Sequence, residues 1–115
     1  MDIKIFHNPR CGTSRTTLGL LRDAGHEPEV IDYLAHPPER EQLRKMIADA
    51  GLTMREAARS KEALFSELGL DAPGIDDEKL LDAMVAHPLL INRPFVITPK
   101  GVRLCRPSER VNEIL

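Results

Sequence analysis

Residues 3–34 read IKIFHNPRCGTSRTTLGLLRDAGHEPEVIDYL and hold the clearest secondary-structure pattern of the chain. Their apolar beginning, residues 3–6, predicts a short strand, and residues 13–24 predict a helix that ends before Gly25. Residues 29–34 predict a second strand. Since two strands joined by a helix within about 30 residues form a βαβ unit, we expect these strands to lie parallel in one sheet.

The middle of the chain, residues 39–86, is predicted to be helical. Residues 39–50 carry apolar side chains at the i, i+3, i+4 and i+7 spacing of an amphipathic helix. Residues 53–56 have the pattern of a capping box, residues 61–68 predict a further helix, and Asp76 is placed to cap the last one. We therefore expect a helical insertion between two ends that contain strands.

The end of the chain returns to strands. Residues 95–98 and 102–105 predict a hairpin, and residues 108–115 predict a final helix. The order βαβ, helices, ββα matches the thioredoxin-like arrangement, in which a proline, often cis, precedes the third strand, as Pro94 does here. We therefore predict an α/β, thioredoxin-like fold with a four-stranded mixed sheet, in a single domain over residues 1–115.

Composition and charge narrow the class of protein. The formal net charge is −2 and no long basic run occurs. One Tyr, three Phe and no Trp give few aromatic rings on which bases could stack. We therefore expect no nucleic-acid partner. No apolar run approaches the roughly 18 residues that span a bilayer, so we expect no membrane association. A strand pattern near the N-terminus gives no sign of a signal peptide, and two cysteines far apart form no disulfide framework, so we expect a cytoplasmic protein.

Cys11 lies at the predicted turn from strand to helix, where unpaired N–H groups and the helix dipole favour negative charge. The same N–H groups can hold an oxyanion. A free thiol has a pKa of about 8.5, and lowering it by two units takes about 2.7 kcal/mol, which helix-end N–H groups and nearby cations can supply. The polar neighbours of Cys11 favour a reactive thiol over the alternative, a small buried structural cysteine.

The motif is Cys-Gly-Thr-Ser, so Ser14 stands where a dithiol oxidoreductase carries its resolving cysteine. We therefore expect no disulfide cycle within the motif; the Ser14 hydroxyl can donate to the thiolate or serve as an ordinary first-turn residue. Arg15 follows Cys11 by only four positions, which excludes a phosphatase loop of the Cys-x5-Arg type. Cys105 ends a predicted strand and is expected to be a buried structural thiol, with a second redox partner as the alternative.

Several basic residues are candidates for binding an anion. Arg93 and Arg106 each stand directly before a proline at a strand end, and the guanidinium fork of arginine suits tetrahedral oxyanions. Arg59 ends the short helix after the capping box. His7 precedes Cys11 by four positions; it either tunes the thiol or binds the anion, or is a buried, hydrogen-bonded histidine. No metal-ligand spacing occurs, so we expect no metal.

Three segments carry a resemblance to a known family: HNPRCGTSR at residues 7–15, INRP at 91–94 and RLCRPS at 103–108. With Tyr33-Leu34, Pro37-Pro38 and His87-Pro88, they closely resemble the glutaredoxin-linked arsenate reductase family over essentially the whole chain. The resemblance implies a thioredoxin-like fold with a helical insertion. It also implies reduction of arsenate to arsenite, with glutathione as co-substrate, glutaredoxin as partner, and no tightly bound cofactor.

The same resemblance implies roles for individual residues. Cys11 is the nucleophile by this likeness. The oxyanion is bound by Arg59, Arg93 and Arg106. His7 tunes the thiol and Ser14 supports the thiolate.

Two other functions stay open at this point. A glutathione-dependent thiol oxidoreductase acting on another substrate would use Cys11 but would not need all the arginines, so replacing Arg93 would leave glutathione-linked activity largely intact. A non-catalytic regulator that binds a protein partner is the second alternative; the polymerase-binding regulators of this superfamily sense oxidation through Cys-x-x-Cys, which this chain lacks. We expect a monomer.

Overall fold

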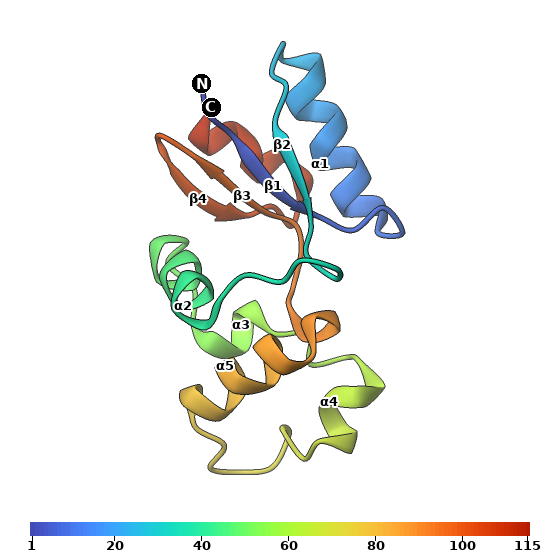
Figure 1. The fold of residues 1–115 in the computed structure, drawn as a ribbon, viewed down its shortest axis with the longest axis vertical. Coiled ribbons are helices and arrows are strands. Elements are labelled where there is room, and N and C mark those ends of the chain that lie inside the picture. Colours follow the sequence, from blue (N-terminus) through green and yellow to red (C-terminus); the bar gives the residue numbers. More distant parts are fainter. The chain divides into compact units, whose positions relative to one another are not determined.

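The computed structural model describes residues 1–115 and divides into two compact units (Figure 1). The sheet unit consists of Met1–His36 and Arg93–Leu115, and the helical unit consists of Pro37–Asn92. The predicted insertion at residues 39–86 falls within the helical unit. That the whole chain acts as one domain stays a prediction.

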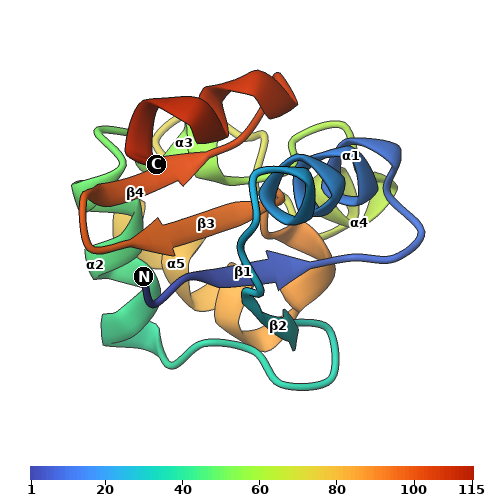
Figure 2. The same ribbon diagram turned by 90° about the horizontal axis from the view of Figure 1, so that it is seen from above.

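The sheet unit contains four strands, β1 (Lys4–His7), β2 (Glu29–Asp32), β3 (Phe95–Thr98) and β4 (Gly101–Leu104). Their order across the sheet is β2-β1-β3-β4 (Figure 2). β1 is parallel to β2 and antiparallel to β3, and β3 pairs antiparallel with β4. The predicted four-stranded mixed sheet is therefore confirmed, as is the βαβ unit at its N-terminal end.

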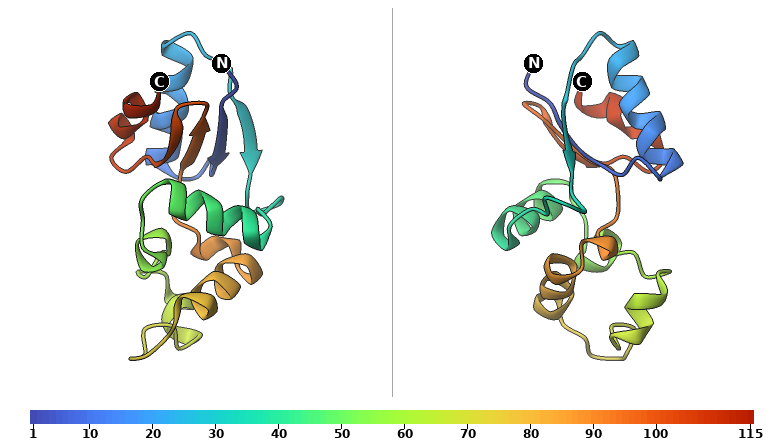
Figure 3. Two further views of the ribbon diagram at one scale, coloured as in Figure 1. Left: turned by 90° about the vertical axis from the view of Figure 1, so that its left-hand side faces the viewer. Right: turned by 45° about the vertical axis from the view of Figure 1, so that its right-hand side comes forward.

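One face of this sheet is covered by α1 (Gly12–Asp23) and η2 (Ser108–Ile114), which pack against each other (Figure 3). The core between sheet and helices is apolar because alternate strand residues and one stripe of each helix point into it. It consists of Ile3, Ile5, Leu18, Leu21, Val96, Cys105, Val111 and Ile114.

The final helix differs from the prediction, because η2 is a 3-10 helix and not an α-helix. Its C-terminal end is bonded from outside the helix: the Thr98 hydroxyl donates to the Ile114 carbonyl at 2.6 Å, and Lys100 Nζ donates to the Leu115 carbonyl at 2.9 Å. The β3–β4 hairpin thus supplies partners for the last two carbonyls of the chain, which no helix could bond internally.

The helical unit contains α2 (Arg40–Asp49), α3 (Met54–Ala57), α4 (Ala63–Glu67), α5 (Asp77–Ala86) and η1 (Pro88–Leu90). η1 is an element that the sequence analysis did not predict; its proline stands at the first helical position, where a missing N–H costs no bond.

Two helix starts in this unit follow their predicted caps. The box between Thr53 and Glu56 is complete, because the Thr53 hydroxyl accepts from the Glu56 N–H at 3.2 Å and the Glu56 carboxylate accepts from the Thr53 N–H at 2.9 Å. Asp76 accepts from the Lys79 N–H at 2.8 Å. Both capping predictions are confirmed. None of the helices has the length and apolar character needed to cross a membrane.

Candidate active site

Cys11 is the N-cap residue of α1, with φ −95° and ψ 121°. Its backbone N–H donates to the Asn8 carbonyl at 3.0 Å, and its carbonyl accepts from the Arg15 N–H at 3.0 Å. Cys11 as a whole is 8% exposed, so it is mostly buried at the positive end of the helix dipole. The strand-to-helix placement predicted for Cys11 is confirmed.

The loop before Cys11 is held by short-range hydrogen bonds. Asn8 Oδ1 accepts from the Arg10 N–H at 3.0 Å, which closes an Asx turn. Arg15 Nη1 donates to the Pro9 carbonyl at 2.8 Å and ties the loop to the first turn of α1. These bonds fix the direction in which the Cys11 side chain leaves the backbone.

The electrostatic setting lowers the pKa of the Cys11 thiol below its ordinary value. Burial alone would raise this pKa, but the backbone N–H of Ser14, the charge of Arg93 and hydrogen bonds from Arg106 and Arg93 together outweigh burial. Arg106 Nη1 lies 3.8 Å from Cys11 Sγ. A larger fraction of Cys11 is therefore thiolate at neutral pH than for a free cysteine, and the thiolate is the nucleophilic form.

Arg93 and Arg106 come from the two ends of the β3–β4 hairpin and meet beside Cys11. Arg106 Nη1 donates to the Arg93 carbonyl at 3.2 Å, so one guanidinium bridges the two segments and the thiol. The peptide bonds Arg93–Pro94 and Arg106–Pro107 are both cis, and the Cys105 N–H donates to the Pro94 carbonyl at 2.9 Å. Arg93 is half-buried and Arg106 is exposed, so the charged groups extend from the buried sulfur to the surface.

Arg59, the third predicted arginine, belongs to the helical unit. Its backbone N–H donates to the Leu90 carbonyl at 2.8 Å, and its guanidinium pairs with the Glu62 carboxylate at 2.8 Å. The side chains of this ion pair are 25% and 24% exposed. A contribution of Arg59 to the oxyanion site stays a prediction.

His7 is a buried histidine whose Nδ1 lies 2.6 Å from the Ser14 hydroxyl oxygen. Burial lowers the pKa of His7, and the positive charges of Arg22 and Arg15 lower it further against the opposing charge of Asp32. His7 is therefore mainly neutral at pH 7. Its hydrogen bond reaches the cysteine motif through Ser14.

Ser14 contacts the thiol through a different atom from the one the sequence suggests. Its hydroxyl accepts from the Asn8 N–H at 3.0 Å and pairs with His7, whereas its backbone N–H is the group that lowers the pKa of Cys11. The hydroxyl is thus committed to holding the loop, and any residue except proline would present the same N–H at this position. The role of Ser14 in supporting the thiolate stays a prediction, now assigned to its backbone.

Cys105 is fully buried and belongs to the core of the sheet unit. Burial raises the pKa of its thiol to about 12, so Cys105 stays protonated at physiological pH. The prediction of a buried thiol is confirmed. A protonated, inaccessible thiol does not fit the alternative of a second redox partner.

Tyr33 is a site neighbour that the residue-by-residue sequence argument did not single out. It directly follows Asp32, which pairs with His7 in the parallel register of β1 and β2. The side chain is 1% exposed. The strand register could have pointed to Tyr33. It places the residue that follows β2 beside the residue that follows β1, and the cysteine loop begins there.

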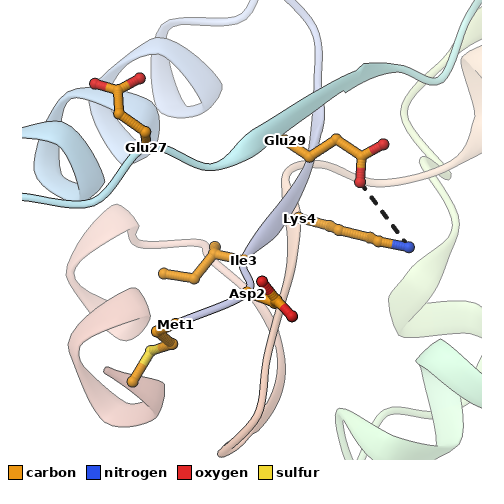
Figure 4. A pocket seen from close by; sticks show the side chains of 6 residues that line it. All are labelled: Met1, Asp2, Ile3, Lys4, Glu27 and Glu29. Atoms are coloured by element: carbon orange, nitrogen blue, oxygen red, sulfur yellow. Dashed lines mark ion pairs between the residues drawn. The ribbon is translucent and has the colours of Figure 1, made fainter.

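A surface pocket elsewhere in the sheet unit contains none of these residues. It is lined by Met1, Asp2, Ile3, Lys4, Glu27 and Glu29 (Figure 4). Its one ion pair joins Lys4 Nζ and the Glu29 carboxylate at 4.0 Å. No group of three or more His, Cys, Asp or Glu side chains is arranged to hold a metal ion.

The sheet unit thus combines a thioredoxin-like sheet, one cysteine of lowered pKa at the start of its first helix and two arginines beside that cysteine. The chain belongs to the ArsC family, whose sequence model matches residues 6–114.

Individual relatives agree with this assignment. The chain is 60% identical over 115 residues to the arsenate reductase of Rhizobium meliloti (strain 1021), covering 100% of this chain and 82% of that protein. It is 53% identical over 114 residues to the arsenate reductase of Escherichia coli (strain K12), covering 99% and 81%. The solved arsenate reductase from Vibrio cholerae has a TM-score of 0.95 at 43% identity, covering 100% of this chain and 98% of that one.

Proposed function

We propose that this protein reduces arsenate to arsenite through the Cys11 thiolate, with glutathione and glutaredoxin supplying the electrons. The observation that carries the proposal is the contact of Arg106 with Cys11 Sγ at 3.8 Å beside Arg93. This contact places a nucleophile next to an arginine, the type of side chain that binds tetrahedral oxyanions. Relatives named arsenate reductases, 53% and 60% identical to this chain, support arsenate as the substrate.

Substrate binding rests on the arginines. Arsenate is a small tetrahedral anion, and Arg93 and Arg106 offer planar sets of N–H donors that match two of its oxygens at a time. Arg106, the exposed member, meets the anion first, and half-buried Arg93 holds it next to the sulfur. Arg59 is proposed as a third ligand, which would require it to exchange its ion pair with Glu62 for the oxyanion.

The first chemical step is attack of the Cys11 thiolate on arsenic(V). A sulfur–arsenic bond forms, and one arsenate oxygen leaves as water after it takes up protons. The arginine charges and the N–H groups at the start of α1 stabilise the negative oxygens in the transition state. Arsenic keeps its +5 oxidation state in the resulting thiolate–arsenate adduct.

The electrons come from two external thiols. Glutathione adds to the arsenic of the adduct and displaces a second oxygen as water. A glutaredoxin thiolate then attacks the glutathione sulfur, forming a mixed disulfide, and the electron pair of the broken sulfur–arsenic bond stays on arsenic, which becomes arsenic(III). Hydrolysis of the remaining bond releases arsenite and returns Cys11 as thiolate. Thiols carry all the electrons, so the scheme needs no metal and no tightly bound cofactor.

This scheme fits a site with one usable thiol. Ser14 occupies the position of a resolving cysteine, and its hydroxyl is bonded to His7 and Asn8. Cys105 is buried with a raised pKa. Resolution by external thiols is therefore the route that these side chains favour.

The test couples arsenate reduction to NADPH oxidation through glutathione reductase, glutathione and glutaredoxin. We expect arsenate-dependent turnover in the wild type and none with Cys11→Ser. Cys105→Ala is the matched control, because it removes the other cysteine from the core and should keep turnover. Turnover that survives Cys11→Ser, or wild type that leaves arsenate unreduced although its Cys11 is ionised, would refute the proposal.

A further inference from the structure

The Tyr33 hydroxyl is a buried polar group without a hydrogen-bond partner. The ring is 1% exposed, so water does not compensate for the missing bond by surrounding the hydroxyl. The Asn8 amide lies close enough to affect the pKa of Tyr33, but no hydrogen bond of acceptable geometry joins the two groups. Since most buried hydroxyls are paired, an unpaired one at this place calls for a functional explanation.

The surroundings of this hydroxyl are those of the cysteine site. Tyr33 follows the strand that pairs with β1, at the level where the chain leaves the sheet toward Cys11. Burial raises the pKa of Tyr33; Asn8 and the charge of Arg93 act to lower it, and the charge of Cys11 adds to the rise. The phenol therefore stays protonated at neutral pH and is able to donate a hydrogen bond.

We propose that Tyr33 donates a hydrogen bond from its hydroxyl to the oxyanion at Cys11, as a further binding residue beside Arg93. The inference rests on the proposed function for the identity of the anion, arsenate. Cys11 is itself buried, at 8% exposure, so an anion that reaches its sulfur must also enter a mostly buried site.

An oxygen of a tetrahedral group bonded to Sγ extends past the sulfur, so it can meet a donor that does not contact the sulfur itself. A hydroxyl already paired within the protein would have to break that bond before it could bind substrate. An unpaired one is ready for the anion at a cost in folding stability, as is common at functional sites.

Tyr33→Phe tests the proposal because it removes the hydroxyl and keeps the ring. We expect kcat/KM for arsenate to fall by about 10- to 100-fold, since one hydrogen bond to a charged group is lost. The pKa of Cys11, measured from the pH dependence of its alkylation by iodoacetamide, should stay unchanged. Tm should stay the same or rise, because no bond within the protein is broken.

Thr98→Val is the matched control, since it also removes one buried hydroxyl from the sheet unit. The Thr98 hydroxyl donates to the Ile114 carbonyl at 2.6 Å and accepts from the Lys100 N–H at 3.0 Å. This variant should lower Tm and leave kcat/KM for arsenate unchanged. The two variants thus separate a hydroxyl that serves the fold from one that serves the substrate.

Three results with the Tyr33→Phe variant would overturn the inference: a kcat/KM within about twofold of wild type, a lower Tm, or a loss of activity that follows a raised pKa of Cys11. Protection of Cys11 from iodoacetamide by arsenate, without glutathione, gives a readout independent of turnover. We expect arsenate to protect Tyr33→Phe only at about tenfold higher concentration than it protects wild type. This result supports the inference even if wild type does not turn over. In that case only the proposed function fails. Wild-type Cys11 that arsenate does not protect contradicts it.

Discussion

Replacing Arg106 by Gln tests how the thiol is activated. The variant keeps hydrogen-bonding capacity near the site but removes the positive charge whose Nη1 lies 3.8 Å from Cys11 Sγ. At that separation a unit charge pair is worth about 1 kcal/mol in bulk water and about 4 kcal/mol at the effective dielectric of a protein surface. Arg106 is exposed, so the lower value applies, and the pKa of Cys11 should rise by about one unit.

The assay is the pH dependence of thiolate absorbance near 240 nm, checked by the rate of alkylation with iodoacetamide. Near neutral pH, a rise of about one unit reduces the thiolate fraction, and with it the alkylation rate, by up to about tenfold. Because the pair is partly solvated, about 1 M salt should bring the wild-type pKa toward that of the variant.

Arg103→Gln is the control for this experiment. Arg103 lies three residues earlier on β4, and its guanidinium pairs with Glu113 at 3.0 Å, so its loss should leave the pKa of Cys11 where it was. The electrostatic account is refuted if Arg106→Gln and Arg103→Gln give the same pKa for Cys11, or if the Arg106 variant lowers it.

Three further predictions concern stability and pH. Ser14→Ala should lower the free energy of unfolding, measured with urea, by about 2 kcal/mol, because it leaves His7 and the buried Asn8 N–H unpaired. The pKa of Cys11, measured by thiol titration, should shift little, since the backbone N–H of residue 14 remains. Cys105 has a folded-state pKa of about 12, above its unfolded value, so its stabilisation is complete below about pH 8.5 and is lost as pH rises, by up to about 1.4 kcal/mol per pH unit. Urea unfolding at pH 8.5 and 9.5 should show a smaller decline in Cys105→Ala than in wild type, and an equal decline would count against a buried, protonated thiol. Thr53→Ala should lower stability by about 1 kcal/mol in thermal unfolding through loss of the capping box, and leave kcat/KM for arsenate unchanged.

The parts of the fold that the sequence predicted well are those set by local pattern. The βαβ unit follows from two apolar runs on either side of an amphipathic helix, and the four-stranded mixed sheet follows from its combination with the hairpin. The cap of α3 was predicted because both of its hydrogen bonds join Thr53 and Glu56, which lie three positions apart in the sequence. Such signals need no knowledge of distant contacts.

The parts that the sequence missed depend on contacts between distant segments. The last helix is a 3-10 helix, and its final carbonyls are bonded by Thr98 and Lys100 of the hairpin, which no local propensity records. β2 ends at Asp32 and not at residue 34, since its pairing with β1 stops where β1 turns toward Cys11.

The candidate site shows the same division. Cys11 was found from its place between strand and helix, and Arg93 and Arg106 from their positions before prolines at strand ends. The engagement of the Ser14 hydroxyl by His7 was not predicted, because it depends on how a buried imidazole is oriented. The unpaired hydroxyl of Tyr33 could not be predicted either, since the absence of a partner is visible only when all neighbouring atoms are placed.

The most direct test of the central claim, that Cys11 reduces arsenate with electrons from external thiols, is to measure arsenite itself together with NADPH consumed. Reduction of arsenic(V) to arsenic(III) takes two electrons, as one NADPH supplies, so we predict equal amounts of arsenite formed and NADPH oxidised, with both lost when glutathione, glutaredoxin or Cys11 is removed. NADPH oxidation without arsenite, or arsenite formed by Cys11→Ser, would contradict the account.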